Sequence, residues 1–182
     1  MWHTYSFKQL FETNLDVACT AYKYRMQGSL RTYITKAFVD DIATALMTKP
    51  SELLDTSIIY GDLPPTKEAT EYLRVSGDYY LTIAGFIPES LCDRYSEFEY
   101  YLYVGKYSYY RLSERIPSEQ VYRTLSFDYM KLIYILNETF DLIKTRDGID
   151  ILKTLEAYNK TRHAIFRKRL TRAGLNLSEI TC

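Results

Sequence analysis

The sequence is poor in the residues that tight turns and disulfide frameworks need. Its 182 residues include 7 glycines, 5 prolines and 3 cysteines. So few turn formers leave little room for the many tight connections of an all-β fold. The cysteines, Cys19, Cys92 and Cys182, are odd in number, lie far apart and form no C-x-x-C pair. We therefore expect reduced thiols in a cytoplasmic protein rather than one disulfide and a free thiol.

Residues typical of catalytic and metal sites are also scarce. There are 2 histidines, and His163 stands among basic residues that disfavour its protonated form. Glu138 and Asp141 have helical spacing, but no Glu-x-x-His accompanies them, and glycine-rich phosphate loops are missing. We expect no metal and no cofactor, and no residue set supports a named enzymatic reaction.

Long apolar runs are missing too. The longest charge-free stretch near the centre, Tyr79–Pro88, is about half of what a bilayer-spanning helix needs. The first eight residues lack the basic start and apolar run of a signal peptide. We expect a soluble protein without a membrane partner.

Net charge is zero, with 23 basic and 23 acidic residues, but the charges are unevenly distributed. Residues 1–143 carry 14 basic and 19 acidic residues, whereas residues 144–172 carry nine and three. We favour docking of this basic segment on the acidic remainder of the chain, with nucleic-acid binding as the alternative. The candidate basic patch comprises Arg162, Arg167, Lys168, Arg169 and Arg172.

What the sequence does contain is apolar residues at steps of three and four, which predict helices. A strand over residues 17–24 is the alternative within the first helix. We expect an all-α fold, a single-domain irregular or orthogonal bundle of five to six helices. The expected helices cover residues 6–26, 29–49, 66–87, 96–115, 118–144 and 149–173. Within one domain, 1–182, we expect an N-terminal appendage (1–28), core helices (29–143), a basic C-terminal helix (144–174) and a tail (175–182).

Tyrosine is in excess: nine of the 19 tyrosines fall between Tyr79 and Tyr110. Its ring is apolar, but its hydroxyl needs a partner when buried, which favours interfaces and internal pockets. The helix over 96–115 has two apolar stripes on nearly opposite sides, so it is either central in the fold or binds something outside it. One stripe holds Phe98, Tyr101, Leu102, Gly105, Tyr109 and Leu112, and the other holds Tyr100, Tyr103, Tyr107 and Tyr110.

Two glycines, Gly77 and Gly85, lie along one side of the preceding helix, near Tyr80. Glycine inside a helix costs about 1 kcal/mol relative to alanine. We expect these positions to allow another helix to approach closely, with a ligand against the backbone as the alternative.

The central segment contains Gly77-Asp78, then Gly85-Phe86-Ile87-Pro88-Glu89, then a tyrosine-rich helix with Gly105 and Tyr109. In this pattern the chain resembles a family of uncharacterised bacterial proteins. The resemblance extends over residues 29–142 and implies a helical domain, with no activity, cofactor or catalytic residue attached.

Three functional hypotheses follow. The first is a non-enzymatic protein-interaction or regulatory module, with a homodimer or another protein bound through the tyrosine stripe. The second is a small-ligand binding or sensor protein with a tyrosine-lined pocket. The third is nucleic-acid binding through the basic C-terminal helix. The candidate ligand or interface residues are Tyr80, Tyr100, Tyr101, Tyr103, Tyr107, Tyr109 and Tyr110.

Overall fold

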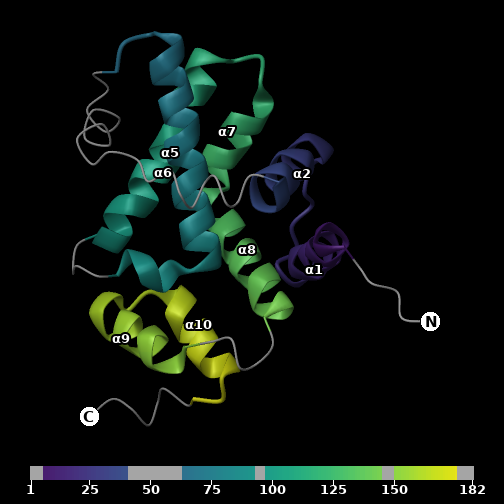
Figure 1. Cartoon of the computed structure of the whole chain (residues 1–182), viewed down its shortest axis with the longest axis vertical. Coiled ribbons are helices and arrows are strands. Elements are labelled where there is room, and N and C mark those ends of the chain that lie inside the picture. Colours follow the sequence, from purple (N-terminus) through teal and green to yellow (C-terminus); the bar gives the residue numbers. More distant parts are fainter. Residues whose placement is uncertain (1–5, 41–62, 93–96, 145–149, 176–182) are drawn as a thin grey trace.

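The computed structural model describes residues 6–40, 63–92, 97–144 and 150–175, and its regular structure there is entirely helical (Figure 1). The predicted all-α class is confirmed, but the expected count of five to six is too low, since eight α-helices are described. The predicted residues 41–49 of the second helix and 176–182 of the tail lie outside the described residues. The elements are α1 (Phe7–Ala21), α2 (Gly28–Thr35), the π-helical turn η1 (Lys36–Asp40), α5 (Lys67–Phe86), the 3₁₀ turn η2 (Pro88–Leu91), α6 (Glu97–Arg115), α7 (Gln120–Phe127), α8 (Tyr129–Ile143), α9 (Ile151–Thr161) and α10 (Ala164–Arg172).

Two helices begin where the predicted ranges begin, and a side-chain cap marks each start. Ser6 Oγ accepts the Gln9 backbone N–H at 3.3 Å, and the Gln9 side chain accepts the Ser6 N–H at 3.0 Å. This reciprocal pair caps the start of α1, which covers residues 7–21. The alternative strand over residues 17–24 is therefore not found. At α5, Thr66 Oγ1 accepts the Ala69 N–H at 3.1 Å.

The two longest predicted helices are each broken, so those two predictions are wrong. The helix expected over 118–144 divides at Asp128 into α7 and α8, and the Asp128 carboxylate accepts the Tyr24 hydroxyl at 2.7 Å. The helix expected over 149–173 divides at Arg162, which adopts the left-handed conformation with φ 54°. Neither break has a glycine or proline to signal it.

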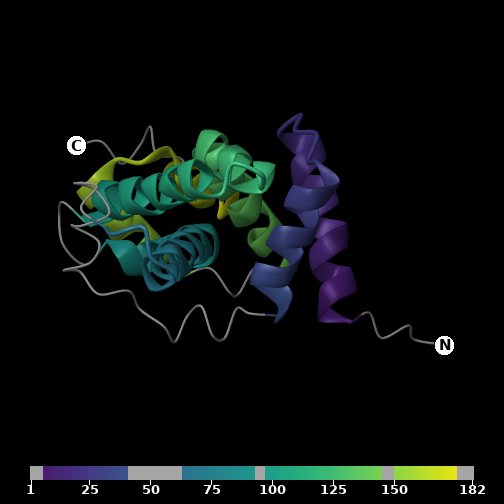
Figure 2. The same ribbon diagram turned by 90° about the horizontal axis from the view of Figure 1, so that it is seen from above.

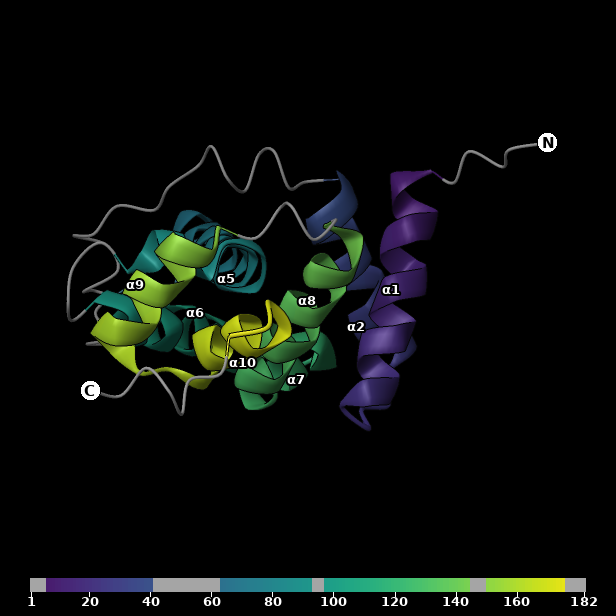
Figure 3. The ribbon, with the colours of Figure 1, turned by 90° about the horizontal axis from the view of Figure 1, so that it is seen from below.

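The helices pack in two groups around α8. On one side, α5 packs against α6 and α6 against α7, while α1 and α2 lie together on the other side of α8 (Figure 2). Seen from below, α9 and α10 cover the ends of α5 and α6 (Figure 3). This arrangement places the C-terminal helices beside η2 and the end of α8.

The predicted N-terminal appendage contributes to the same core as the rest of the described chain. Phe11 and Leu15 of α1 are completely buried. The Phe11 ring lies 6.0 Å from the Phe38 ring and 5.7 Å from the Phe140 ring of α8. Residues 7–21 are therefore part of the main apolar cluster.

The glycines of α5 allow close helix packing, as expected. A Cβ at Gly77 would lie 2.8 Å from a ring carbon of Tyr109 in α6, and one at Gly85 would lie 2.9 Å from Cβ of Leu136 in α8. These side chains occupy the space that the alternative prediction assigned to a ligand.

Candidate functional site

The inner stripe of α6 is core. Tyr109 is completely buried, Tyr101 is 7% exposed, and Tyr80 of α5 is 1% exposed. The Tyr80 and Tyr101 rings stack with their centroids 5.1 Å apart. Neither of the two cavities described below is lined by these three tyrosines. Their burial gives the expected tyrosine-lined ligand pocket no support at this position.

Asp78 supplies the polar partner that the buried hydroxyls require. Its Oδ1 accepts the Tyr33 hydroxyl at 2.6 Å and the Tyr109 hydroxyl at 2.8 Å, and its Oδ2 accepts Arg74 Nη1 at 3.1 Å. Burial raises the pKa of Asp78, although both hydroxyls and Arg74 act in the opposite direction. Burial, together with this carboxylate, raises the pKa of both tyrosines. The network joins α2, α5 and α6 through satisfied hydrogen bonds, as a structural polar core does.

The outer stripe of α6 is a row of stacked rings on the surface. The Tyr103 and Tyr107 centroids lie 5.6 Å apart at 10° between planes, and those of Tyr107 and Tyr110 lie 5.3 Å apart at 25°. Tyr103 is 49% exposed and Tyr110 is 42% exposed. We call these three residues the tyrosine ladder. Tyr100 does not continue the row: its ring meets Tyr101 edge to face at 5.4 Å.

The surroundings of the ladder are partly apolar. Together with Lys106 and Ser126, the three rings line a shallow cavity of about 210 Å³. Phe127, the residue after Ser126, is 87% exposed. A hydrogen bond with Glu114 raises the pKa of the Tyr110 hydroxyl.

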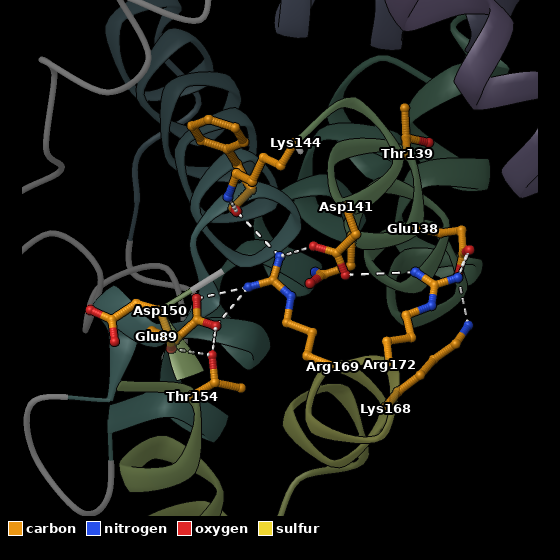
Figure 4. A network of polar contacts seen from close by, with 12 residues as sticks. Glu89, Glu138, Thr139, Asp141, Lys144, Asp150, Thr154, Lys168, Arg169 and Arg172 are labelled. Atoms are coloured by element: carbon orange, nitrogen blue, oxygen red, sulfur yellow. Dashed lines mark hydrogen bonds and ion pairs between the residues drawn. The ribbon is translucent and has the colours of Figure 1, made fainter. Parts of the chain in front are cut away.

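The predicted basic patch is largely turned inward, onto acidic residues (Figure 4). Arg169 is 4% exposed; its Nη1 contacts both oxygens of Glu89 at 2.7 and 2.8 Å, and its Nη2 lies 3.0 Å from Asp141 Oδ1. Lys168 Nζ lies 2.7 Å from Glu138 Oε2, and Arg172 also pairs with Glu138. Burial raises the pKa of Asp141, while Arg169 acts to lower it.

The remaining two basic residues point elsewhere. The Arg162 guanidinium lies 5.3 Å from the Tyr158 ring centroid, a cation–π contact within α9 and its end. Arg167 is exposed on α10. The structure therefore does not gather the five predicted cations on one free surface.

A larger cavity of about 480 Å³ lies beside this ion-pair network. It is enclosed by η2, the residue after α8, and the two C-terminal helices. The sequence alone did not indicate it, because its walls come from segments more than 50 residues apart. The lining residues are Ile87, Glu89, Ser90, Cys92, Lys144, Asp150, Lys153, Glu156, Ala157, Lys160 and Arg169.

His163 caps a helix. Its Nδ1 accepts the Ile165 backbone N–H at 3.4 Å at the start of α10. Its ring packs against those of Phe98, Tyr134 and Phe166. Burial lowers its pKa, as predicted in direction, but the cause is this aromatic surrounding rather than neighbouring cations.

Cys19 and Cys92 are buried, and the Cys92 thiol donates to the Pro88 carbonyl oxygen at 3.6 Å, whereas Cys182 lies outside the described residues. Within the described ranges, no group of three or more His, Cys, Asp or Glu side chains could hold a metal ion. None of the helices described there combines the length and apolar character needed to cross a membrane. Comparisons of this chain with protein families, curated proteins and solved structures find no match.

Proposed function

We propose that the protein is a non-enzymatic interaction module of the bacterial cytoplasm that forms a weak homodimer through the tyrosine ladder. The observation that supports it is that Tyr103, Tyr107 and Tyr110 stack along the outer side of α6, where Tyr103 and Tyr110 are exposed and Tyr107 is partly buried. Tyrosine suits such a surface, because its ring supplies apolar area and its hydroxyl tolerates water before binding.

The spacing of the ladder favours a second copy as the partner. The two end residues of the ladder, Tyr103 and Tyr110, lie equally far along the chain from the midpoint between Lys106 and Tyr107. Two α6 helices packed antiparallel about that point place Tyr103 of one copy opposite Tyr110 of the other, and Lys106 opposite the Tyr107 ring. Ring stacking and cation–π contact suit these pairs, and a two-fold dimer requires a self-complementary patch of this kind.

The size of the ladder sets the expected affinity. A buried aromatic side chain removes about 150–250 Å² from water, so the partly exposed ladder offers about 250 Å² per copy. A stable interface buries about 800 Å² per partner. Even with contributions from neighbouring residues, we expect a dimer with a dissociation constant of about 1 μM or weaker.

Sedimentation velocity over about 1–500 μM protein tests this proposal, since that range brackets the expected constant. The weight-average mass of the wild type should rise toward twice the monomer mass. The variants Tyr103→Glu and Tyr107→Glu should stay monomeric, because each places a carboxylate inside an apolar contact.

Leu152→Glu provides the matched control, since Leu152 is 72% exposed on α9 and is not part of the ladder. This variant should dimerise like the wild type. A wild type that remains monomeric throughout, or tyrosine variants that dimerise normally, would refute the homodimer.

The nucleic-acid alternative has less support. Lys168, Arg169 and Arg172 are already paired with carboxylates of the same chain. Binding phosphate would require those ion pairs to break, which removes much of the electrostatic gain that drives such binding.

A further inference from the structure

The cavity of about 480 Å³ beside η2 has the size of a small-molecule site. Ile87 and Ala157 contribute apolar wall, while Lys144, Lys160 and Arg169 bring positive charge from three separate parts of the chain. Eight of the eleven lining residues are polar or charged, so the cavity favours a charged ligand that also has a small apolar part.

Two of the three acidic lining residues already have hydrogen-bond and ion-pair partners within the chain. Both oxygens of Glu89 accept Arg169 Nη1, and its Oε1 also accepts the Thr154 hydroxyl at 2.9 Å. Asp150 caps α9 by accepting the Lys153 N–H at 3.1 Å, and the Lys153 ammonium lies 3.7 Å from the same carboxylate. The remaining acid, Glu156, is exposed.

Two of the lysines have no such partner. Lys144 Nζ donates to the Phe86 carbonyl oxygen at 3.2 Å, and Lys160 Nζ donates to the Cys92 carbonyl oxygen at 3.3 Å. Among the described residues, no carboxylate forms an ion pair with either ammonium group. Burial and the nearby Arg169 lower the pKa of Lys144, although the carboxylates of Asp141 and Glu89 act to raise it.

We propose that this cavity binds a small organic anion, with a carboxylate or phosphate group placed between Lys144 and Lys160 and an apolar part against Ile87 and Ala157. The anion would form the direct ion pairs that the two ammonium groups do not form with the described residues. Lys144 is half-buried and Lys160 is exposed, so the charged group would reach Lys144 from the side of Lys160.

Isothermal titration of the full chain at low ionic strength tests the site, with inorganic phosphate and citrate as the probes. We expect saturable binding of at least one probe with a stoichiometry of one per chain. Preference for one probe identifies the phosphate or the carboxylate as the recognised group.

Lys144→Gln and Lys160→Gln should each weaken that binding at least tenfold. Lys67→Gln is the control, because Lys67 is an exposed lysine at the start of α5. Lys160 is exposed as well, so its replacement tests the site even if the Lys144 variant fails to fold.

Absence of saturable binding of either probe up to about 10 mM, weaker than ordinary metabolite affinity, overturns the proposal. Equal weakening by Lys67→Gln also overturns it, because that result means non-specific screening of surface charge. This experiment is independent of the dimer, which involves a different face of the molecule.

Discussion

Gly105 of α6 lies against two buried tyrosines, and replacing it with alanine tests how tightly this part of the core is packed. A Cβ at this position would meet the Tyr129 hydroxyl directly, and would lie 2.8 Å from Tyr129 Cζ and 2.9 Å from Tyr80 Cβ. Tyr129 is completely buried, and the Cβ of Tyr80 is fixed to its own helix. Neither neighbour can move aside by a simple side-chain rotation.

Two opposing effects set the size of the change. Alanine is favoured over glycine inside a helix by about 1 kcal/mol. Overpacking a core costs about 1–3 kcal/mol, and the fixed neighbours place Gly105→Ala at the upper end of that range. We therefore expect the free energy of unfolding to fall by about 2 kcal/mol, which for a chain of this size lowers Tm by about 4–8 °C.

Removing the Tyr129 hydroxyl tests whether this group is the main obstacle to a side chain at Gly105. The hydroxyl is buried and has no hydrogen-bond partner among the described residues, so Tyr129→Phe should be neutral or stabilising. In that background Gly105→Ala should cost about 1 kcal/mol less, because the closest clash has been removed. Urea denaturation of the four proteins measures this coupling. If Gly105→Ala alone raises stability, helix propensity dominates and the close contact with Tyr129 does not exist.

Two further predictions concern the C-terminal helices. Arg169→Leu should lower the free energy of unfolding by about 3–5 kcal/mol, because it leaves Glu89 and Asp141 without their common partner. Arg167→Leu, on the exposed face of α10, should change the free energy of unfolding little. Equal effects of the two variants in urea denaturation would contradict the ion-pair assignment. His163→Asn should keep the helix cap but remove the pH dependence of stability that the imidazole causes. The pKa of His163 is lowered by burial from 6.5, so its contribution to stability is complete above pH 6.5 and is lost as pH falls through that value toward the folded pKa. The wild type should therefore lose more Tm than the variant between about pH 7.5 and pH 5, and parallel curves from thermal scans would show that the imidazole does not titrate in this way.

Local features of the fold could be predicted from the sequence, because their causes are local. Ser6 and Thr66 act as helix caps with partners three residues away. Gly77 and Gly85 mark close helix contacts, because glycine inside a long helix is unfavourable unless space requires it. In each case a few neighbouring residues determine the outcome.

Features that depend on tertiary contacts could not be predicted. The break at Asp128 is accompanied by a hydrogen bond from Tyr24, 104 residues away, and the break at Arg162 places a non-glycine residue at positive φ. The sequence of α6 shows its two apolar stripes. Which stripe faces outward depends on the position of α5, which the sequence of α6 does not contain. The inward position of the basic residues did have a signal in the sequence. Glu138 and Asp141 are three residues apart, and so are Arg169 and Arg172, which form ion pairs with them.

The ion pairs of α10 also have a consequence for biosynthesis. Ribosomes release the chain from its N-terminus, so Glu89, Glu138 and Asp141 emerge well before Arg169 and Arg172. Until those cations emerge, the carboxylates cannot leave water without a large penalty. The carboxylates of η2 and of the end of α8 must therefore remain hydrated until Arg169 and Arg172 have emerged, and α10 completes their burial last.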